Sequence, residues 1–221
     1  MADFSQKALD NPSANYVLII DEINRANLPS VMGELIYALE YRYDEDNQDQ
    51  TTVESMYSLK SDEEDVVGDR QLSLPSNLFI IGTMNTADRS VGHIDYAIRR
   101  RFAFVEVLPS IEPVKNNLAK EYFEKVSKLF VSNYEEAISS HEIPRNSSCL
   151  ASDFKPEEVW IGHSYFITDK EGAAGDIEIK TKMKYEVLPL IKEYVKDGIL
   201  YSDQGNSDDP VQKVVNELSQ L

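Results

Sequence analysis

Tyr16-Val-Leu-Ile-Ile-Asp-Glu-Ile-Asn-Arg25 is the stretch that decides the fold of this 221-residue chain. Val17 to Ile20 form a continuous apolar run, which is typical of a parallel strand covered on both faces. Asp21 and Glu22 follow at the carboxyl end of that strand, where open α/β sheets bind their ligands. The stretch therefore predicts an α/β protein with a ligand site beside two adjacent carboxylates. A solvated acidic turn is the alternative interpretation of the pair.

A second apolar run, Leu78-Phe-Ile-Ile-Gly-Thr-Met84, predicts another strand, and it ends at Asn85. A neutral amide at a strand end can hydrogen-bond a phosphate oxygen and an attacking water without adding negative charge. Residues 95–101 predict a short helix capped near Asp95, and residues 102–108 predict a third strand. The helix ends in three arginines, which cannot all point one way because helical neighbours are about 100° apart. One arginine can therefore face an adjoining subunit, although a solvated helix end is the alternative.

Adjacent carboxylates after a buried strand are the arrangement of a Walker B element in nucleoside triphosphatases. In that arrangement the first carboxylate, here Asp21, holds Mg²⁺ directly or through water. The second, here Glu22, polarises the water that attacks the γ-phosphate.

These segments together resemble the McrB branch of the AAA+ nucleotidases, the motor subunits of modification-dependent restriction systems. The block from Gly82 to Ser90 is the specific signature of that branch. The resemblance implies a partial P-loop NTPase (AAA+) αβα sandwich with a parallel sheet, followed by an α-helical lid subdomain. The matching segments are Ile20-Asp-Glu-Ile-Asn-Arg-Ala-Asn27, Gly82-Thr-Met-Asn-Thr-Ala-Asp-Arg-Ser90, Asp95-Tyr-Ala-Ile-Arg-Arg-Arg-Phe102, Ile161-Gly-His-Ser-Tyr-Phe166 and Val187-Leu-Pro-Leu-Ile-Lys-Glu-Tyr194.

The resemblance implies a role for each matching residue. Asp21 corresponds to the Mg²⁺-associated carboxylate and Glu22 to the catalytic one. Asn85 corresponds to the sensor that orients the lytic water. Asp88 and Arg89 belong to the same nucleotide-binding loop, which they brace or join to the neighbouring subunit.

The arginines imply an assembly. Arg101 stands where AAA+ proteins place an arginine finger donated in trans, and Arg100 is the next candidate. Such a finger is worth roughly 10³ to 10⁵ in turnover, so activity is expected to require assembly. Members of this branch form rings, commonly hexameric, and use GTP or ATP with Mg²⁺. In the family, modified DNA is recognised by a separate domain and cleaved by an McrC-type endonuclease partner, so this chain is expected to meet DNA only indirectly.

One departure from the family is the lack of any Gly-x-x-x-x-Gly-Lys-Ser/Thr segment, since the first glycine is Gly33. Cradling phosphates needs converging backbone N–H groups and a lysine. We therefore expect the C-terminal half of an AAA+ module, inactive unless the Walker A half joins it. The central strand of the sheet would then be missing, so the isolated chain is expected to be poorly stable or to gain a strand from another polypeptide.

The predicted organisation is an α/β core over residues 1–109 and a helical lid over 110–221. An acidic insert at about residues 43–74 is predicted as a hairpin, with strands at 51–59 and 71–74. It is either a solvated insertion or a contact for a partner or the ring pore.

Helical segments are predicted on both sides of the insert. Residues 28–39 carry a core-facing apolar stripe, and Asn24 and Arg25 just before it either fix the loop or contact a neighbour. Residues 112–138 carry long helical periodicity, and 182–195 resemble the closing lid helix, with Pro189 kinking it or lying near its start. The segment 157–166 predicts a lid turn anchored by Trp160, although His163 or Ser164 reading the nucleotide state is the alternative.

Composition agrees with a cytoplasmic nucleotidase. The formal net charge of −17 argues against this chain gripping DNA alone. A single cysteine, Cys149, excludes an internal disulfide, and neither a secretion signal nor a membrane-spanning apolar run is found. Two alternative functions are a non-catalytic or split-gene subunit that acts through ring assembly, and a MoxR or dynein-related AAA+ ATPase. The signature from Met84 to Ser90 argues against the latter.

Overall fold

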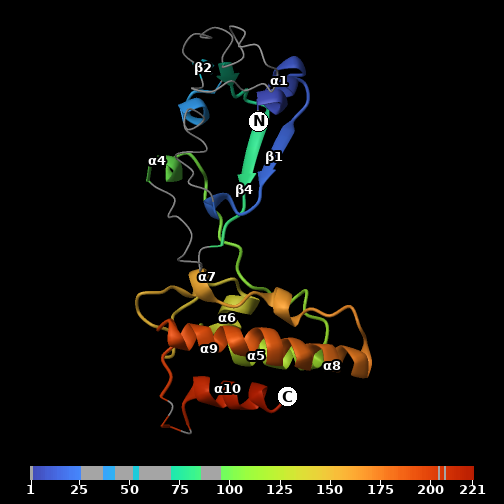
Figure 1. Ribbon diagram of the computed structural model, residues 1–221, viewed down its shortest axis with the longest axis vertical. Coiled ribbons are helices and arrows are strands. Elements are labelled where there is room, and N and C mark those ends of the chain that lie inside the picture. The colour runs from blue at the N-terminus through green and yellow to red at the C-terminus, as the bar shows by residue number, and fades with distance from the viewer. Residues whose placement is uncertain are drawn as a thin grey trace, which may run out of the picture. The chain divides into compact units, whose positions relative to one another are not determined.

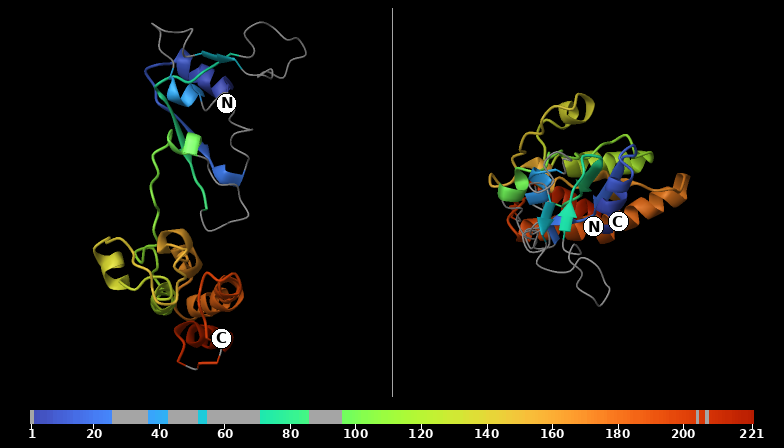
Figure 2. Two further views of the ribbon diagram at one scale, coloured as in Figure 1. Left: turned by 90° about the vertical axis from the view of Figure 1, so that its left-hand side faces the viewer. Right: turned by 90° about the horizontal axis from the view of Figure 1, so that it is seen from above.

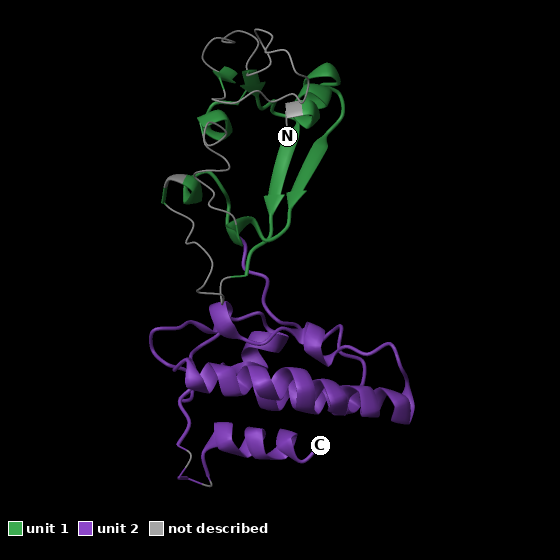
Figure 3. Ribbon diagram, viewed as in Figure 1, with its two compact units in different colours: residues 1–104 green, residues 105–221 purple. Residues whose placement is uncertain are grey.

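The computed structural model describes residues 2–25, 37–42, 52–54, 71–85, 96–203, 205–206 and 208–221. The chain divides into two compact units, residues 1–104 (unit 1) and 105–221 (unit 2), coloured separately in Figure 3. The boundary expected from the sequence lies after residue 109.

Unit 1 is built on two parallel strands, β1 (Tyr16–Ile20) and β4 (Leu78–Gly82), which run side by side in Figure 1. Tyr16 pairs with Leu78 and Ile20 with Gly82, so the carboxyl ends of the two strands coincide. Both predicted strands are therefore confirmed. Their parallel pairing agrees with the expected α/β fold.

The side chains on one face of this sheet pack against helices, and those on the other face are exposed. Helix α1 (Ala2–Asp10) and the helical residues 37–40 contribute to the packed side. On the other side Val17, Ile19, Phe79 and Ile81 are 47%, 67%, 50% and 52% exposed. The prediction that both faces are covered is therefore wrong for the described residues, because their helices pack only against the alternate side chains. The core of the packed side consists of Ala8, Ala38, Leu74 and Leu78, with Phe4, Tyr16, Leu18, Leu39, Val53 and Ile80 packed against it.

The insert contains a short antiparallel pair, β2 (Thr52–Glu54) with β3 (Gln71–Ser73), which confirms the pairing predicted for its two arms. Its acidic residues between the arms lie outside the described residues, as do 26–36 of the predicted helix. The arginine-rich segment forms the helix α4 (Tyr96–Arg99), and its expected cap, Asp95, also lies outside them.

Residues 102–108 form no strand, contrary to the prediction. Val105 and Val107 are 83% and 91% exposed. An apolar segment becomes a strand only where a neighbouring backbone takes up its hydrogen bonds. In the described part of unit 1, β1 and β4 pair with each other and neither pairs with this segment.

Unit 2 is helical around an aromatic core. The helix expected over 112–138 is interrupted between Ser127 and Tyr134, and there Val131 forms a β-bridge with Asn146. Leu129, Phe130 and Val131 are all buried, and three consecutive residues cannot share one face of a helix. The helical elements of unit 2 are α5 (Asn117–Ser127), α6 (Tyr134–Ser139), α7 (Pro156–Val159), η3 (His163–Phe166), α8 (Gly172–Lys182), η4 (Met183–Val187), α9 (Leu188–Lys196) and α10 (Pro210–Ser219).

Helices α8 and α9 continue into each other through the π-helical turn η4, as Figure 2 also shows. The N–H of Leu188 bonds the carbonyl of Met183, five residues back. Pro189 has no N–H, and its ring would clash with the carbonyl four residues earlier in an ordinary α-helix. The wider turn accommodates it, and Pro189 lies at the start of α9, one of the two predicted positions. No helix in the described ranges is both long and apolar enough to cross a membrane.

Candidate functional site

Backbone hydrogen bonds continue past the carboxyl ends of β1 and β4, between the residues that follow the two strands. The N–H of Thr83 donates to the carbonyl of Ile20 at 3.0 Å, and the N–H of Ile23 donates to the carbonyl of Thr83 at 2.8 Å. Asp21 and Glu22 lie within this closed segment, Asp21 exposed and Glu22 half-buried. The two predicted carboxylates are therefore attached directly to the paired ends of β1 and β4.

Gly82 allows the segment to pass close to β4. A Cβ at this position would lie 2.9 Å from Cδ1 and 3.1 Å from Cγ2 of Ile23. Ile23 is buried and packs with Ile98 of α4. The missing side chain of Gly82 thus leaves room for the residue that follows the two carboxylates.

Glu22 has a left-handed backbone, with φ of 53°. This conformation costs a residue with a side chain about 1–2 kcal/mol. Two contacts hold it: the Glu22 N–H donates to Oγ1 of Thr83 at 3.1 Å, and its Oε2 pairs with Nε of Arg25 at 3.1 Å. Such backbone outliers concentrate at functional sites, which agrees with a functional carboxylate here.

Asn24 and Arg25 make contacts that fix the loop carrying the two carboxylates. The buried Asn24 donates from Nδ2 to the carbonyl of Asn85 at 3.1 Å, and Arg25 pairs with Glu22. Of the two interpretations left open by the sequence, these contacts favour fixing of the loop. They also bring Asn85, the predicted sensor, next to the segment that carries the carboxylates. Asp88 and Arg89 lie outside the described residues.

The three arginines at the end of α4 have different surroundings, as the sequence predicts; Arg99 is the last residue of the helix, and Arg100 and Arg101 lie in the turn that follows. The Arg101 side chain is 13% exposed and forms an ion pair with Glu40 of its own chain. The Arg99 guanidinium lies 4.9 Å from the centre of the Phe104 ring. Arg100 is exposed. Arg101, the first candidate for the arginine finger, thus pairs within its own chain, whereas Arg100, the second candidate, is exposed.

Oxygen ligands suit a divalent cation at this site. Mg²⁺ prefers carboxylate oxygens and retains several waters, and the Asp21 carboxylate is exposed at the strand end. The Thr83 hydroxyl donates to Oδ1 of Asp21, which occupies one of about four acceptor positions on the carboxylate. The residues present therefore fit a hydrated Mg²⁺ at Asp21.

Thr83 was not predicted as a site residue from the sequence, where it belongs only to the signature from Gly82 to Ser90. The signal was its position one residue beyond a strand that runs parallel to β1. In such a pair the first residues after the two strands lie opposite each other, so a hydroxyl there meets the acidic pair.

The lid turn in unit 2 is a packed element. The indole N–H of Trp160 donates to Oγ of Ser127 at 2.8 Å, and its ring stacks on Phe123 with centroids 6.4 Å apart. Nδ1 of His163 accepts the N–H of Ser110 at 3.1 Å. These contacts agree with a turn anchored by Trp160, and one nitrogen of His163 is already engaged.

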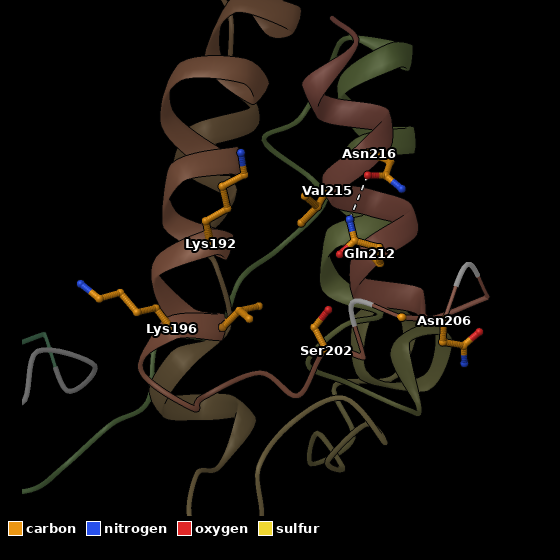
Figure 4. Close-up of a pocket in the computed structure, with 9 residues that line it drawn as sticks. Lys192, Lys196, Ser202, Asn206, Gln212, Val215 and Asn216 are labelled. Atoms are coloured by element: carbon orange, nitrogen blue, oxygen red, sulfur yellow. Dashed lines mark hydrogen bonds between the residues drawn. The ribbon is translucent and has the colours of Figure 1, made fainter.

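A groove in unit 2 lies between α9 and α10 (Figure 4). Lys192 and Lys196 line it from α9, while Gln212 and Asn216 line it from α10 and are joined by a 2.9 Å hydrogen bond. All the described residues that line this groove belong to unit 2.

Comparison with known proteins identifies the family. Residues 6–102 match the family described as AAA domain (dynein-related subfamily). The chain is 35% identical over 201 residues to the Type IV methyl-directed restriction enzyme EcoKMcrB subunit of Escherichia coli (strain K12), an alignment that covers 88% of this chain and 40% of that protein. The chain is an AAA+ protein of the McrB type. The matched domain contains the described site from Asp21 to Arg101 of this McrB-type chain.

A second relative also belongs to a restriction system. The McrB-type chain is 39% identical over 98 residues to the Type II restriction enzyme BsuMI component YdiS of Bacillus subtilis (strain 168), which covers 44% of this chain and 28% of that protein. The chain thus spans two-fifths or less of the length of either relative. The dynein-related description, an alternative left open by the sequence, applies to residues 6–102.

Proposed function

We propose that this McrB-type chain supplies the hydrolytic residues of a GTPase or ATPase that works in a restriction system. The observation that carries the proposal is the joined end of β1 and β4. There Asp21 and Glu22 are held by hydrogen bonds to Thr83, with Asn85 beside them. The proposed reaction is attack of water on the γ-phosphate of the nucleotide.

The roles follow from position. Asp21 would hold Mg²⁺, which supplies positive charge to the phosphate oxygens when bound. Glu22 would accept the proton of the attacking water, and its release from Arg25 would make both carboxylate oxygens available. Asn85 would orient the same water, and Asp88 and Arg89 would support that loop.

Assembly is the second part of the proposal. A Gly-x-x-x-x-Gly-Lys-Ser/Thr segment from outside these 221 residues would cradle the phosphates. A ring, hexameric by family resemblance, would bring an arginine from a neighbouring subunit. Because Arg100 is exposed and Arg101 is paired with Glu40, we propose Arg100 as the residue that reaches the neighbour. The ring would drive DNA translocation with an McrC-like endonuclease, and the charge of −17 leaves direct DNA binding to other parts.

The test is nucleotide hydrolysis by the chain assembled with the polypeptide that carries the phosphate-binding loop. Glu22→Gln should lower turnover at least about 100-fold while nucleotide binding persists, because it removes only the proton acceptor. Glu54→Gln on β2, an exposed carboxylate, is the matched control and should leave turnover unchanged. Full activity in Glu22→Gln would contradict the proposal. An inactive wild-type assembly that still forms rings would favour a non-catalytic subunit.

A further inference from the structure

Thr83 makes four hydrogen bonds to four consecutive residues of the acidic segment. Its backbone N–H and carbonyl bond Ile20 and Ile23. Its hydroxyl bonds both Asp21 and Glu22. A single residue, directly after β4, therefore holds the whole segment that carries the two carboxylates.

The direction of each hydroxyl contact is determined by proton count. A backbone N–H only donates, so Oγ1 of Thr83 accepts from Glu22. The one hydroxyl proton is then left for Asp21, whose ionised carboxylate only accepts. The hydroxyl thus links the Asp21 side chain to the Glu22 backbone in one defined arrangement, and no rotation of Thr83 satisfies both contacts in another way.

This link acts on the two groups differently. At Asp21 it orients the carboxylate and leaves its other acceptor positions open. At Glu22 it holds a backbone with φ of 53°, which a residue with a side chain rarely adopts, and so sets the direction in which the carboxylate leaves the chain. Ile23, buried beyond it, anchors the far side of the same turn.

We propose that Thr83 is a positioning residue for hydrolysis: its hydroxyl sets the orientation of Asp21 and Glu22 relative to each other. The inference rests on the proposed function of these carboxylates and adds a specific requirement, a hydroxyl at position 83. Partners that orient ligand carboxylates without touching the substrate are typically worth 10–100-fold in metal affinity or activity.

The test compares Thr83→Val, which keeps the β-branched shape, with Thr83→Ser, which keeps the hydroxyl. In the assembled nucleotidase Thr83→Val should lower kcat about 10–100-fold. The KM for nucleotide should change less than about threefold, and the Mg²⁺ concentration for half-maximal rate should rise severalfold. Thr83→Ser should keep kcat and the Mg²⁺ requirement close to the wild-type values. A structural role alone would not shift the Mg²⁺ requirement.

A second measurement needs no nucleotide. In the 221-residue chain, the amide of Glu22 should exchange with deuterium at least about tenfold faster in Thr83→Val than in the wild type or Thr83→Ser. The amides of β1 act as the control for folding. Unchanged exchange in Thr83→Val would overturn the proposed link, and unchanged kcat and Mg²⁺ requirement would overturn its role in positioning. Loss of hydrolysis in every assembly, wild type included, would instead overturn the proposed function, and the exchange rates would still decide whether Thr83 holds the segment.

Discussion

Gly82→Ala is the substitution that tests most directly how the acidic segment is held. The added Cβ would lie 2.9 Å from Cδ1, 3.1 Å from Cγ2 and 3.3 Å from Cβ of Ile23, all shorter than an ordinary carbon contact. Ile23 is buried against Ile98 and has little room to move. Overpacking of this kind costs about 1–3 kcal/mol. Alanine recovers about 0.4–1 kcal/mol by restricting the unfolded chain, so we expect a net loss of about 1–2 kcal/mol.

Amide hydrogen exchange of β1 and β4 measures this loss locally. A destabilisation of this size should accelerate exchange of these amides about 5–30-fold. Ile23→Val removes Cδ1, the atom nearest the new methyl group, at its own cost of about 0.5–1.5 kcal/mol. The double variant should therefore lose at least about 0.5 kcal/mol less than the sum of the single losses. Strictly additive losses, or unchanged exchange in Gly82→Ala, would refute the close approach of Gly82 and Ile23.

Two further predictions concern unit 2. Ser127→Ala leaves the buried indole N–H of Trp160 without its acceptor, so it should lower the free energy of unfolding by about 1–3 kcal/mol. Urea unfolding followed by the fluorescence of this single tryptophan measures the loss. The control Ser219→Ala, at an exposed position, should change stability by no more than about 0.5 kcal/mol, and equal losses in the two variants would argue against the Trp160 hydrogen bond. Burial raises the pKa of Tyr134 and of Tyr194 to about 12, above the value of about 10 in an unfolded chain. Their contribution to stability is therefore present below about pH 10 and is lost as the pH rises toward about 12. Tyrosinate absorbance should show these two of the twelve tyrosines ionising last, together with unfolding, and a single transition of all twelve near pH 10 would contradict their burial.

The sequence was sufficient wherever a local pattern carries the information. The apolar runs of β1 and β4 predict both strands within a few residues, although not the exposure of one of their faces. Asp21 and Glu22 follow β1 directly, so their place at the sheet edge needs only the strand end. That the three consecutive arginines do not share one direction also follows from local geometry, although their partners do not.

Local patterns gave wrong predictions where an element needs a hydrogen-bonding or packing partner elsewhere in the chain. Residues 102–108 have strand-forming composition, yet a strand also needs a backbone beside it, and the described residues provide none. The periodicity of 112–138 suggested one helix, but the buried run at Leu129 to Val131 turns the chain instead. Both errors arise because propensity is local, whereas hydrogen-bond partners and burial are set by the rest of the fold.

The sequence by itself thus determined the chemistry available to this McrB-type chain: two carboxylates at a strand end, an amide beyond the end of the next strand and a cluster of arginines. Only the tertiary structure decided how that chemistry is arranged. It placed the Thr83 hydroxyl against Asp21 and Glu22, and it paired Arg101 with Glu40, contacts between residues about sixty positions apart. Such contacts leave no periodic trace in the sequence, because each depends on the parallel pairing of β1 with β4 or on the packing of α4, and not on neighbouring residues along the chain.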